Sequence, residues 1–296
     1  MIHHHTCPLC NDHSIRFDFS AIDHTVSGET YEVWRCNNCQ GLFTQDVPEE
    51  DQIGKYYNSE DYISHSDTKE GWINAAYHQV RNITLNNKKS LIEKETGIAA
   101  GTLLDVGCGT GAFLNKMNKG GWKVAGVEPD PGARETAADQ YGLQISPSGN
   151  LSNLPPAHYD AITLWHVLEH VHDIHGYLQQ LVRLLKPDGK LFIAVPNYTS
   201  ADARQYKETW AAFDVPRHLY HFSPHSMNIL LSRHGLKIRK MKPMWFDSFY
   251  VSMLSEKNSH RDGNILSAFA AGLKSNINAL TNSTQCSSLI YIASKS

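Results

Sequence analysis

Two patterns of apolar and polar residues distinguish the N-terminal third of the chain. Residues 15–19 and 31–35 alternate in character, which is typical of two short strands, and Ser27-Gly28-Glu29 suits a turn between them. From about residue 71 to 95, apolar side chains recur every three to four residues, so we expect a long helix with one apolar face. The residues of this face are Ile73, Tyr77, Val80, Ile83 and Leu91.

A different pattern starts at residue 101. The apolar run 102–106 predicts a buried strand, residues 112–119 predict a helix, and residues 122–128 predict a second strand. This order predicts a parallel βαβ unit, the building block of α/β sheets. The turn between the first strand and the helix is rich in glycine, which suits a sharp bend and a close approach of the backbone to a ligand.

The composition limits the classes of protein to consider. With 296 residues, of which 41% are hydrophobic, the chain is long enough for about two domains with packed cores. Its 27 basic and 30 acidic residues leave a formal charge of -3, which disfavours a nucleic-acid partner held by its phosphates. The sequence has no apolar run long enough to span a membrane and no secretory signal pattern, so we expect a cytoplasmic protein without a membrane partner.

Four of the six cysteines form two C-x-x-C pairs. In a reducing compartment such pairs hold metal more often than they form disulfides, and Zn²⁺ takes four thiolates in a closed tetrahedral shell. A disulfide or a redox C-x-x-C is the alternative. Residues 1–45 are too few to be stable by burial alone, so a structural zinc would hold this module together, and it resembles a zinc ribbon. The predicted zinc ligands are Cys7, Cys10, Cys36 and Cys39.

The glycine-rich turn distinguishes between two classes of nucleotide site. Residues 105–111 read DVGCGTG, with a G-x-G-x-G spacing, whereas a dinucleotide site has G-x-G-x-x-G with its third glycine inside the helix. An acidic residue, Glu128, ends the second strand, where it can accept hydrogen bonds from both hydroxyls of a ribose. We therefore expect a cofactor that carries a ribose but no pyrophosphate.

The turn resembles motif I of class I S-adenosylmethionine-dependent methyltransferases, and residues 124–130, VAGVEPD, resemble the segment that follows it. Residues 186–190, KPDGK, are similar to the turn before the fifth strand of that family. The resemblance implies an α/β, Rossmann-like sheet of seven strands, with strand seven antiparallel, over residues 101–296 and with a helical insertion at about 246–284. Residues 46–100 would form a helical connector or lid. The further strands implied lie at 159–165, 191–196, 236–241 and 287–293, and the next helix at 173–185.

The same resemblance implies where S-adenosylmethionine binds. Asp105 would anchor the amino end, the glycines would border the methionine and ribose portions, and Glu128 would take the ribose hydroxyls. Asn150 stands where the family has an acid that contacts adenine, and an amide oxygen can still accept from the adenine amino group. We expect the tyrosine-rich loop of residues 56–65 to lie over the ligand, and simple packing is the alternative. The predicted cofactor-binding residues are Asp105, Gly107, Cys108, Gly109, Gly111, Glu128, Pro129, Asn150, Leu151, Trp165, His166, Tyr62 and His65.

Residues 166–170, HVLEH, match the H-x-x-E-H pattern of zinc proteases, which on a helix would place His166 and His170 on one face. Their position after a predicted strand disfavours a protease, because the methyltransferase family commonly has LEHV there. Some ubiquinone-type O-methyltransferases similarly have an acid in place of His166 and use the three residues for a divalent ion. Packing of the two histidines and Glu169 is the default expectation, and a divalent ion is the alternative.

A second histidine-rich segment, residues 213–224, follows the predicted fifth strand, where the acceptor docks in this family. The segment resembles the HEHLSYFS segment of sugar C-methyltransferases, which also begin with a cysteine-rich zinc module. On that match His218 stands for the base histidine, while Arg217 replaces its acidic neighbour. We expect His218 or His221 to remove a proton as the methyl group arrives, and simple packing of both histidines is the alternative.

Together these patterns predict a methyltransferase with a zinc ribbon that uses S-adenosylmethionine and a small polar acceptor, which we expect to be a sugar nucleotide or a related metabolite. Two rival functions stay open. A ribosomal RNA guanine methyltransferase also opens with CPLC, although its second ligand pair ends in histidine and its substrate requires a basic surface. The chain could instead bind the cofactor and recruit a partner without transferring a methyl group.

Overall fold

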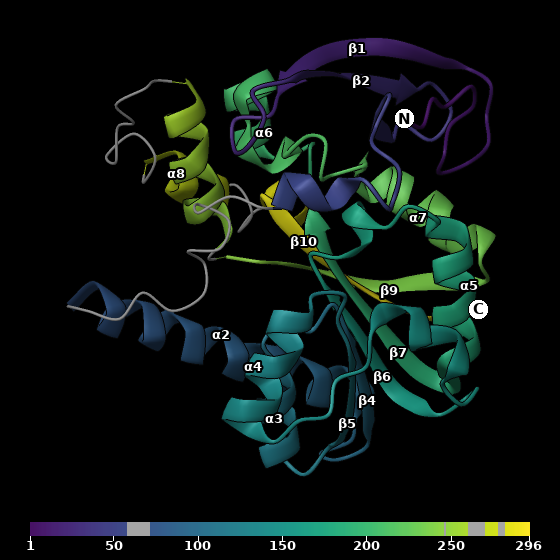
Figure 1. Ribbon diagram of the computed structural model, residues 1–296, viewed down its shortest axis with the longest axis vertical. Helices are drawn as coiled ribbons and strands as arrows, with labels where there is room; N and C mark the ends of the chain where they lie inside the picture. The colour runs from purple at the N-terminus through teal and green to yellow at the C-terminus, as the bar shows by residue number, and fades with distance from the viewer. Residues whose placement is uncertain (58–71, 246, 260–269, 278–281) are drawn as a thin grey trace.

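The main body of the computed structural model is an α/β unit built on a twisted sheet (Figure 1). The structure describes residues 1–57, 72–245, 247–259, 270–277 and 282–296. Within these residues the sheet has six strands in the order β5-β4-β6-β7-β10-β9. The strands are β4 (Thr102–Val106), β5 (Lys123–Val127), β6 (Tyr159–Trp165), β7 (Leu185–Pro196), β9 (Leu236–Pro243) and β10 (Ser288–Lys295).

The direction of the last strand agrees with the prediction. β10 runs antiparallel to both of its neighbours, β7 and β9, whereas the pairs from β5 to β7 are parallel. The expected strand beyond β5 is reduced to one bridge between Val127 and Ser146, so the described sheet has six strands and not seven. Pairing stops there because Pro147 follows and has no N–H to continue the ladder.

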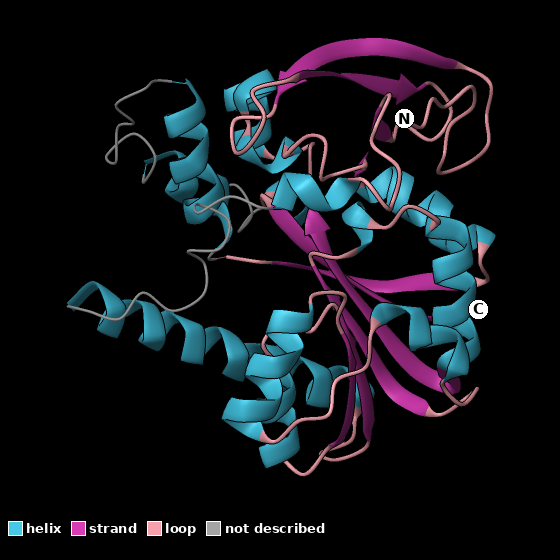
Figure 2. Cartoon of the chain, viewed as in Figure 1, coloured by secondary structure: helices cyan, strands magenta, loops and turns pink. Residues whose placement is uncertain are grey.

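Helices cover both faces of the sheet, with α2, α3 and α4 on one side and α5 and α7 on the other (Figure 2). Side chains alternate along a strand, so consecutive residues of β4 enter different cores. Leu103 packs in the cluster that contains Trp122. Leu104 packs on the opposite face, in the cluster that contains Leu178. The helices are α2 (Trp72–Thr96), α3 (Ala112–Lys119), α4 (Pro131–Tyr141), α5 (Ile174–Leu184) and α7 (Pro224–Arg233).

The helix α2 exists as predicted, but its apolar face is not buried as predicted. Val80 is 40% exposed and Ile83 is 42% exposed, whereas Ile92 near the other end is fully buried. Figure 1 shows the N-terminal end of α2 projecting away from the sheet. The prediction was wrong for Val80 and Ile83 because helical periodicity does not say how much of a helix rests on its neighbours.

The N-terminal residues form a second sheet, in the order β1-β2-β3-β8, beyond the carboxyl end of β7 (Figure 1). Its last strand comes from the histidine-rich segment: Leu42 lies opposite His221, and Phe43 lies opposite Tyr220. The N-terminal sheet is thus completed by a strand that is distant in the sequence. Its strands are β1 (Ile15–Ile22), β2 (Thr30–Cys36), β3 (Leu42–Thr44) and β8 (Tyr220–His221).

Two further helices, α6 (Ala201–Tyr206) and α8 (Asp247–Ser259), pack beside the N-terminal sheet. The Tyr206 hydroxyl donates to Glu256 of α8 at 2.9 Å, which holds α8 against the segment after β7. None of the described helices is long and apolar enough to cross a membrane. The short 3-10 helices are η1 (Ile53–Tyr57), η2 (Ser148–Asn153), η3 (Leu168–His170), η4 (Lys207–Thr209), η5 (Ala211–Phe213) and η6 (Ser283–Gln285).

Candidate functional site

The glycine-rich turn lies at the carboxyl end of β4, beside the end of β5. Gly107 and Gly109 adopt φ angles of 68° and 52°, which glycine tolerates better than other residues. A Cβ atom on Gly107 would lie 2.5 Å from Cγ2 of Val167, so a larger residue does not fit there. On Gly109 such an atom would have nothing within 4 Å. The turn therefore presents the backbone of Gly109 to open space that a ligand can enter.

Glu128 holds this turn from the end of β5. Its Oε2 accepts a hydrogen bond of 2.8 Å from the Gly109 N–H, and its Oε1 accepts one of 3.0 Å from the Asp130 N–H. Each ionised carboxylate oxygen has a second lone pair, so both can accept a further hydrogen bond from a ligand. The protein thus orients the carboxylate, and both oxygens can still accept a hydrogen bond from a ligand.

Asp105 lies near the end of β4, one residue before the buried Val106 and the turn. It is 2% exposed, and the hydroxyl of Thr163 donates to its Oδ1 at 2.6 Å. Burial raises the pKa of Asp105 to about 7, although the Thr163 hydrogen bond and the charge of Lys88 act in the opposite direction. A cationic ligand beside Asp105 would favour its ionised form.

Lys88 brings a positive charge to this edge of the sheet from α2. Its ammonium nitrogen lies 4.2 Å from the centroid of the Trp165 ring, at the end of β6. The indole nitrogen of Trp165 is buried and has no hydrogen-bond partner among the described residues. The sequence analysis missed Lys88, because a lysine in a long polar helix carries no local signal that it faces a site.

His166 follows Trp165 with a φ of 59° and contacts two carboxylates. Its Nδ1 lies 3.3 Å from Oε1 of Glu169, and its Nε2 lies 3.0 Å from Oδ2 of Asp247. The second contact is an ion pair whose angle is not that of a hydrogen bond. Burial opposes protonation of the ring, but Asp247 and Glu169 together raise the pKa of His166 to about 10. Asp247 starts α8, and no motif pointed to it.

The other residues predicted to bind the cofactor differ in their exposure. Asn150 in η2 and Pro129 after β5 are exposed, and Cys108 is half-buried. Leu151 is only 4% exposed and packs in the core. Gly111 begins α3. The predicted residues outside the described part of the chain are Tyr62 and His65.

Glu169, His170 and His218 form a cluster in which Glu169 and His218 are buried and His170 is half-buried, with one side-chain nitrogen or oxygen of each within 4.8 Å of the others. The Nδ1 of His218 lies 2.8 Å from the carbonyl oxygen of Ala212. A carbonyl only accepts, so this nitrogen carries a proton, and in the neutral ring Nε2 has the free lone pair. The Oε2 atom of Glu169 is buried without a hydrogen-bond partner among the described residues. Burial, reinforced by His218, lowers the pKa of His170 to about 4.

The H-x-x-E-H segment is not helical in the way that the sequence suggested. Leu168–His170 form a single 3-10 turn, and His166 precedes that turn with a positive φ. His166 and His170 therefore do not share a helix face, and His218 takes the place that the pattern assigned to His166. The spacing of the two histidines does not by itself make a helix.

The other candidate base, His221, lies outside this cluster. It is 3% exposed, and its Nε2 lies 3.1 Å from the hydroxyl of Thr44. Burial lowers the pKa of His221 well below its ordinary value. The ring of His221 also packs against that of Phe213, with the two centroids 5.1 Å apart.

The four cysteines predicted to bind zinc converge at one point. The Sγ atoms of Cys7 and Cys39 are 3.6 Å apart, as are those of Cys10 and Cys36, and all four residues are buried. Four sulfurs around Zn²⁺ at about 2.3 Å would be about 3.8 Å from one another. The four thiols can therefore hold one tetrahedral cation with little movement, and none of them is in a disulfide.

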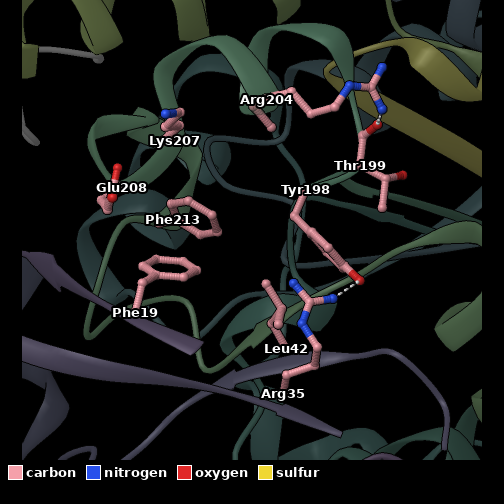
Figure 3. A pocket seen from close by; sticks show the side chains of 10 residues that line it. Phe19, Arg35, Leu42, Tyr198, Thr199, Arg204, Lys207, Glu208 and Phe213 are labelled. Atoms are coloured by element: carbon pink, nitrogen blue, oxygen red, sulfur yellow. Dashed lines mark hydrogen bonds between the residues drawn. The ribbon is translucent and has the colours of Figure 1, made fainter. Parts of the chain in front are cut away.

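A separate cavity of about 370 Å³ lies between the N-terminal sheet and the segment after β7 (Figure 3). Arg35 points across it and donates to the Tyr198 hydroxyl at 3.1 Å. Asp18 binds the same guanidinium at 3.1 and 2.8 Å, so this charge is already neutralised. Of the predicted cofactor-binding residues that the structure describes, none lines this cavity.

Comparison with known proteins decides the family. Residues 78–241 match the family model described as a methyltransferase domain, a match that contains the glycine-rich turn, Glu128 and the histidine cluster. This chain belongs to that methyltransferase family. The predicted family is thereby confirmed, and the α/β fold with an antiparallel last strand agrees with it.

Curated relatives of the methyltransferase are named ubiquinone biosynthesis O-methyltransferase. One from Vibrio cholerae is 32% identical over 128 residues, which cover 40% of this chain and 51% of that protein. Another, from Xylella fastidiosa, is 28% identical over 159 residues, which cover 51% of this chain and 65% of that protein. The chain therefore spans about half to two thirds of the length of these relatives.

A solved structure has the same fold as the methyltransferase. Magnesium protoporphyrin IX methyltransferase from Synechocystis PCC 6803, with bound S-adenosylhomocysteine, matches 84% of this chain and 100% of that chain with a TM-score of 0.54. The two sequences are 14% identical, so the likeness shows the fold alone.

We predict that protonation of Asp105 stabilises the ligand-free methyltransferase. The pKa of Asp105 is about 7 in the folded protein, and about 3.9 is expected in an unfolded chain. The folded state thus binds more protons between these values, so the free energy of unfolding falls as the pH rises through that range, by up to about 4 kcal/mol. Urea unfolding at several pH values should show that Asp105→Asn removes this fall.

Asp139 is an exposed acid on α4 and gives a matched control. Asp139→Asn should keep the pH dependence of the wild type. A difference in stability between the wild type and Asp105→Asn that does not change with pH would contradict the prediction.

Proposed function

We propose that this chain transfers the methyl group of S-adenosylmethionine to a small polar acceptor. The observation that best supports this function is the arrangement at the ends of β4 and β5, where the open backbone of Gly109 lies beside the buried carboxylates of Asp105 and Glu128. The cofactor supplies a methyl group that is already electrophilic on its sulfonium. The protein then has to hold the methyl group and the acceptor in line, about 3 to 3.5 Å apart.

The charges at this edge fit the amino-acid end of the cofactor. Asp105 would pair with its amino group, and the pKa of Asp105 would fall when that cation binds. Lys88 lies close enough to Asp105 to affect its pKa, and it would pair with the carboxylate of the same moiety. The Trp165 ring, on which the Lys88 ammonium rests, would line the pocket near the sulfonium.

The nucleoside end would lie along the glycine-rich turn. Glu128 has lone pairs left over from its bonds to Gly109 and Asp130, and these would accept from the ribose hydroxyls. Asn150, exposed in η2, would contact the adenine. We also propose that Tyr62 and His65, which lie outside the described residues, contact the ligand.

We predict that Glu128→Ala weakens S-adenosylhomocysteine binding by about 10- to 100-fold, because hydrogen bonds to a charged group contribute about 1.5 to 3 kcal/mol. Isothermal titration calorimetry measures the change. Glu128→Gln keeps a side-chain acceptor and should give an intermediate loss. Glu135→Ala, at an exposed acid of α4, is the control and should bind like the wild type. Equal affinities for Glu128→Ala and Glu135→Ala would overturn the cofactor assignment.

His218 is the residue that we propose to deprotonate the acceptor. Its proton lies on Nδ1, toward Ala212, so the lone pair of Nε2 is available on the side of Glu169 and His170. The relatives are named O-methyltransferases, which supports a hydroxyl group as the attacking atom. A sugar nucleotide or related metabolite with such a hydroxyl fits the net charge of -3, which disfavours nucleic acid.

Removal of the base should affect turnover and not cofactor affinity. We predict that His218→Ala lowers methyl transfer by a factor of about 10² to 10⁴ while S-adenosylhomocysteine binding is unchanged. The assay measures S-adenosylhomocysteine released from S-adenosylmethionine with a panel of sugar nucleotides and hydroxylated metabolites. His225→Ala, at an exposed histidine of α7, is the control. Near-normal turnover by His218→Ala would remove His218 from the mechanism.

A divalent cation is a second candidate for activating the acceptor. The observation that favours it is the approach of Glu169, His170 and His218 to within 4.8 Å. A mild chelator that leaves the cysteine-bound metal in place distinguishes the two candidates. Loss of turnover with this chelator would assign the cluster to a cation, and unchanged turnover would leave His218 as the base.

Zinc is the cation that we propose for the four cysteines, with a structural role, because four sulfurs close the coordination shell. We predict one zinc ion per chain by mass spectrometry of the purified protein. Cys36→Ser should lose zinc and lower the unfolding midpoint by several degrees or more, since each kcal/mol shifts it by about 2 to 4 °C. Cys286→Ser, at a buried cysteine outside the cluster, should keep both the zinc ion and the unfolding midpoint of the wild type. A zinc-free wild type with the same midpoint would contradict the assignment.

The rival functions give different results in the same assays. Salt-dependent binding of ribosomal RNA, with methyl transfer to it, would favour an RNA methyltransferase. Cofactor binding without product across the metabolite panel would favour a recruitment module. Methyl transfer to a small metabolite supports the proposed function, for which we also keep the expectation of a cytoplasmic enzyme.

A further inference from the structure

We infer that Asp23, in the turn between β1 and β2, is a positioning residue that holds His218 in place through Arg217 and Asp214. The N-terminal module would thereby contribute to the acceptor site without touching the acceptor. The inference rests on the proposed function for the role of His218 as the base. The position of the His218 ring is a separate matter and can be tested without an acceptor.

Asp23 is 1% exposed and has two tasks in the structure. Its carboxylate accepts hydrogen bonds from backbone N–H groups of the turn, the shortest from Ser27 at 2.9 Å. The same carboxylate accepts from Nη2 of Arg217 at 2.9 Å. Burial opposes ionisation, yet the bonds from Arg217 and Ser27 hold the pKa of Asp23 below its ordinary value. Asp23 is therefore ionised. Its charge pairs with Arg217, in addition to the hydrogen bonds that the carboxylate accepts from the turn.

Arg217 connects the N-terminal turn to the histidine-rich loop. Its side chain is fully buried, and a second carboxylate, that of Asp214, binds it in a fork, with Nε at 3.0 Å and Nη2 at 2.6 Å. Its Nη1 donates to the carbonyl of Tyr56 at 2.9 Å. A guanidinium that is shielded from water needs each of these partners, because a buried charge without a partner destabilises the fold.

Asp214 connects Arg217 to His218. It has a φ of 38°, a left-handed conformation that is uncommon for an aspartate and that the fork to Arg217 holds in place. Its carbonyl accepts from the His218 N–H at 3.0 Å, and its Oδ2 lies 4.0 Å from Nε2 of His218. Backbone and carboxylate of Asp214 thus both set the place of the imidazole.

Loss of the Asp23 charge would leave Nη2 of Arg217 with one carboxylate instead of two in a site without solvent. The guanidinium would then shift toward other acceptors, and the fork to Asp214 would shift with it. The loop conformation at Asp214 would no longer be fixed, and His218 would lose its single hydrogen bond to Ala212. The expected effect is a mobile His218 ring in a protein that is otherwise folded.

The test uses the full chain labelled with ¹⁵N in its histidine rings and records long-range ¹H–¹⁵N NMR spectra at mildly alkaline pH. The His218 signals are assigned by their loss in His218→Gln. In the wild type they should show one protonated nitrogen, Nδ1, and one bare nitrogen, Nε2. Asp23→Asn keeps a side-chain oxygen for the turn but loses the charge. In this variant the chemical shifts of Nδ1 and Nε2 of His218 should approach each other, because the proton is no longer held on Nδ1.

Asp18→Asn is the matched control, because Asp18 also binds an arginine in a fork from β1, but that arginine is Arg35, which donates to Tyr198. It should leave the His218 signals as in the wild type. If backbone amide spectra show that Asp23→Asn is unfolded, Arg217→Lys, which keeps the charge and loses the fork, takes its place and should average the His218 signals.

Two separate, unshifted His218 signals in the folded Asp23→Asn protein, or in Arg217→Lys where that replaces it, would overturn the inference. The proposed function fails in a different way. If the wild type shows an ordered His218 while His218→Ala keeps full turnover, the base assignment is lost and the positioning by Asp23 stands.

Discussion

A charge that is removed from water has to be paired within the protein, and Arg217 imposes this constraint most strongly here. Its guanidinium is bound by Asp23 of the N-terminal sheet, by Asp214 of its own loop and by the carbonyl of Tyr56 in η1. Because these partners come from three separate segments, the charge is satisfied only when all three meet. The N-terminal sheet, η1 and the histidine-rich loop therefore assemble around this one side chain.

Side chains of opposite charge lie next to one another at the edge of the sheet where we propose that the cofactor binds. Burial opposes ionisation of Asp105, Lys88 and His166, and in each case a neighbour of opposite charge opposes that effect. A ligand that carries both an ammonium and a carboxylate can exchange partners with such a set without leaving a charge unpaired. The electrostatics thus suit a zwitterionic amino-acid moiety better than a simple anion or cation.

Predictions from the sequence succeeded where a feature depends on the backbone or on covalently close neighbours. The two C-x-x-C pairs converge, and the turn at Gly107 and Gly109 has the positive φ angles that its glycines suggested. Predictions failed where they depended on what a side chain packs against. Val80 and Ile83 are exposed on a real helix, and no pattern showed that His218 joins Glu169 and His170. Periodicity describes a repeat along the chain and not the surface that the repeat meets.

The sequence by itself determined the order of strands and helices, the methyltransferase family and the cysteine cluster, because glycine conformations, C-x-x-C spacing and strand–helix alternation are short-range properties. Only the tertiary structure decided that β8 completes the N-terminal sheet, that Lys88 and Asp247 reach the proposed cofactor edge, and that His218 joins Glu169 and His170. Each of these contacts joins segments far apart in the chain. Such contacts form because the whole fold has to bury apolar surface and pair buried charge at once, a requirement that no local pattern expresses.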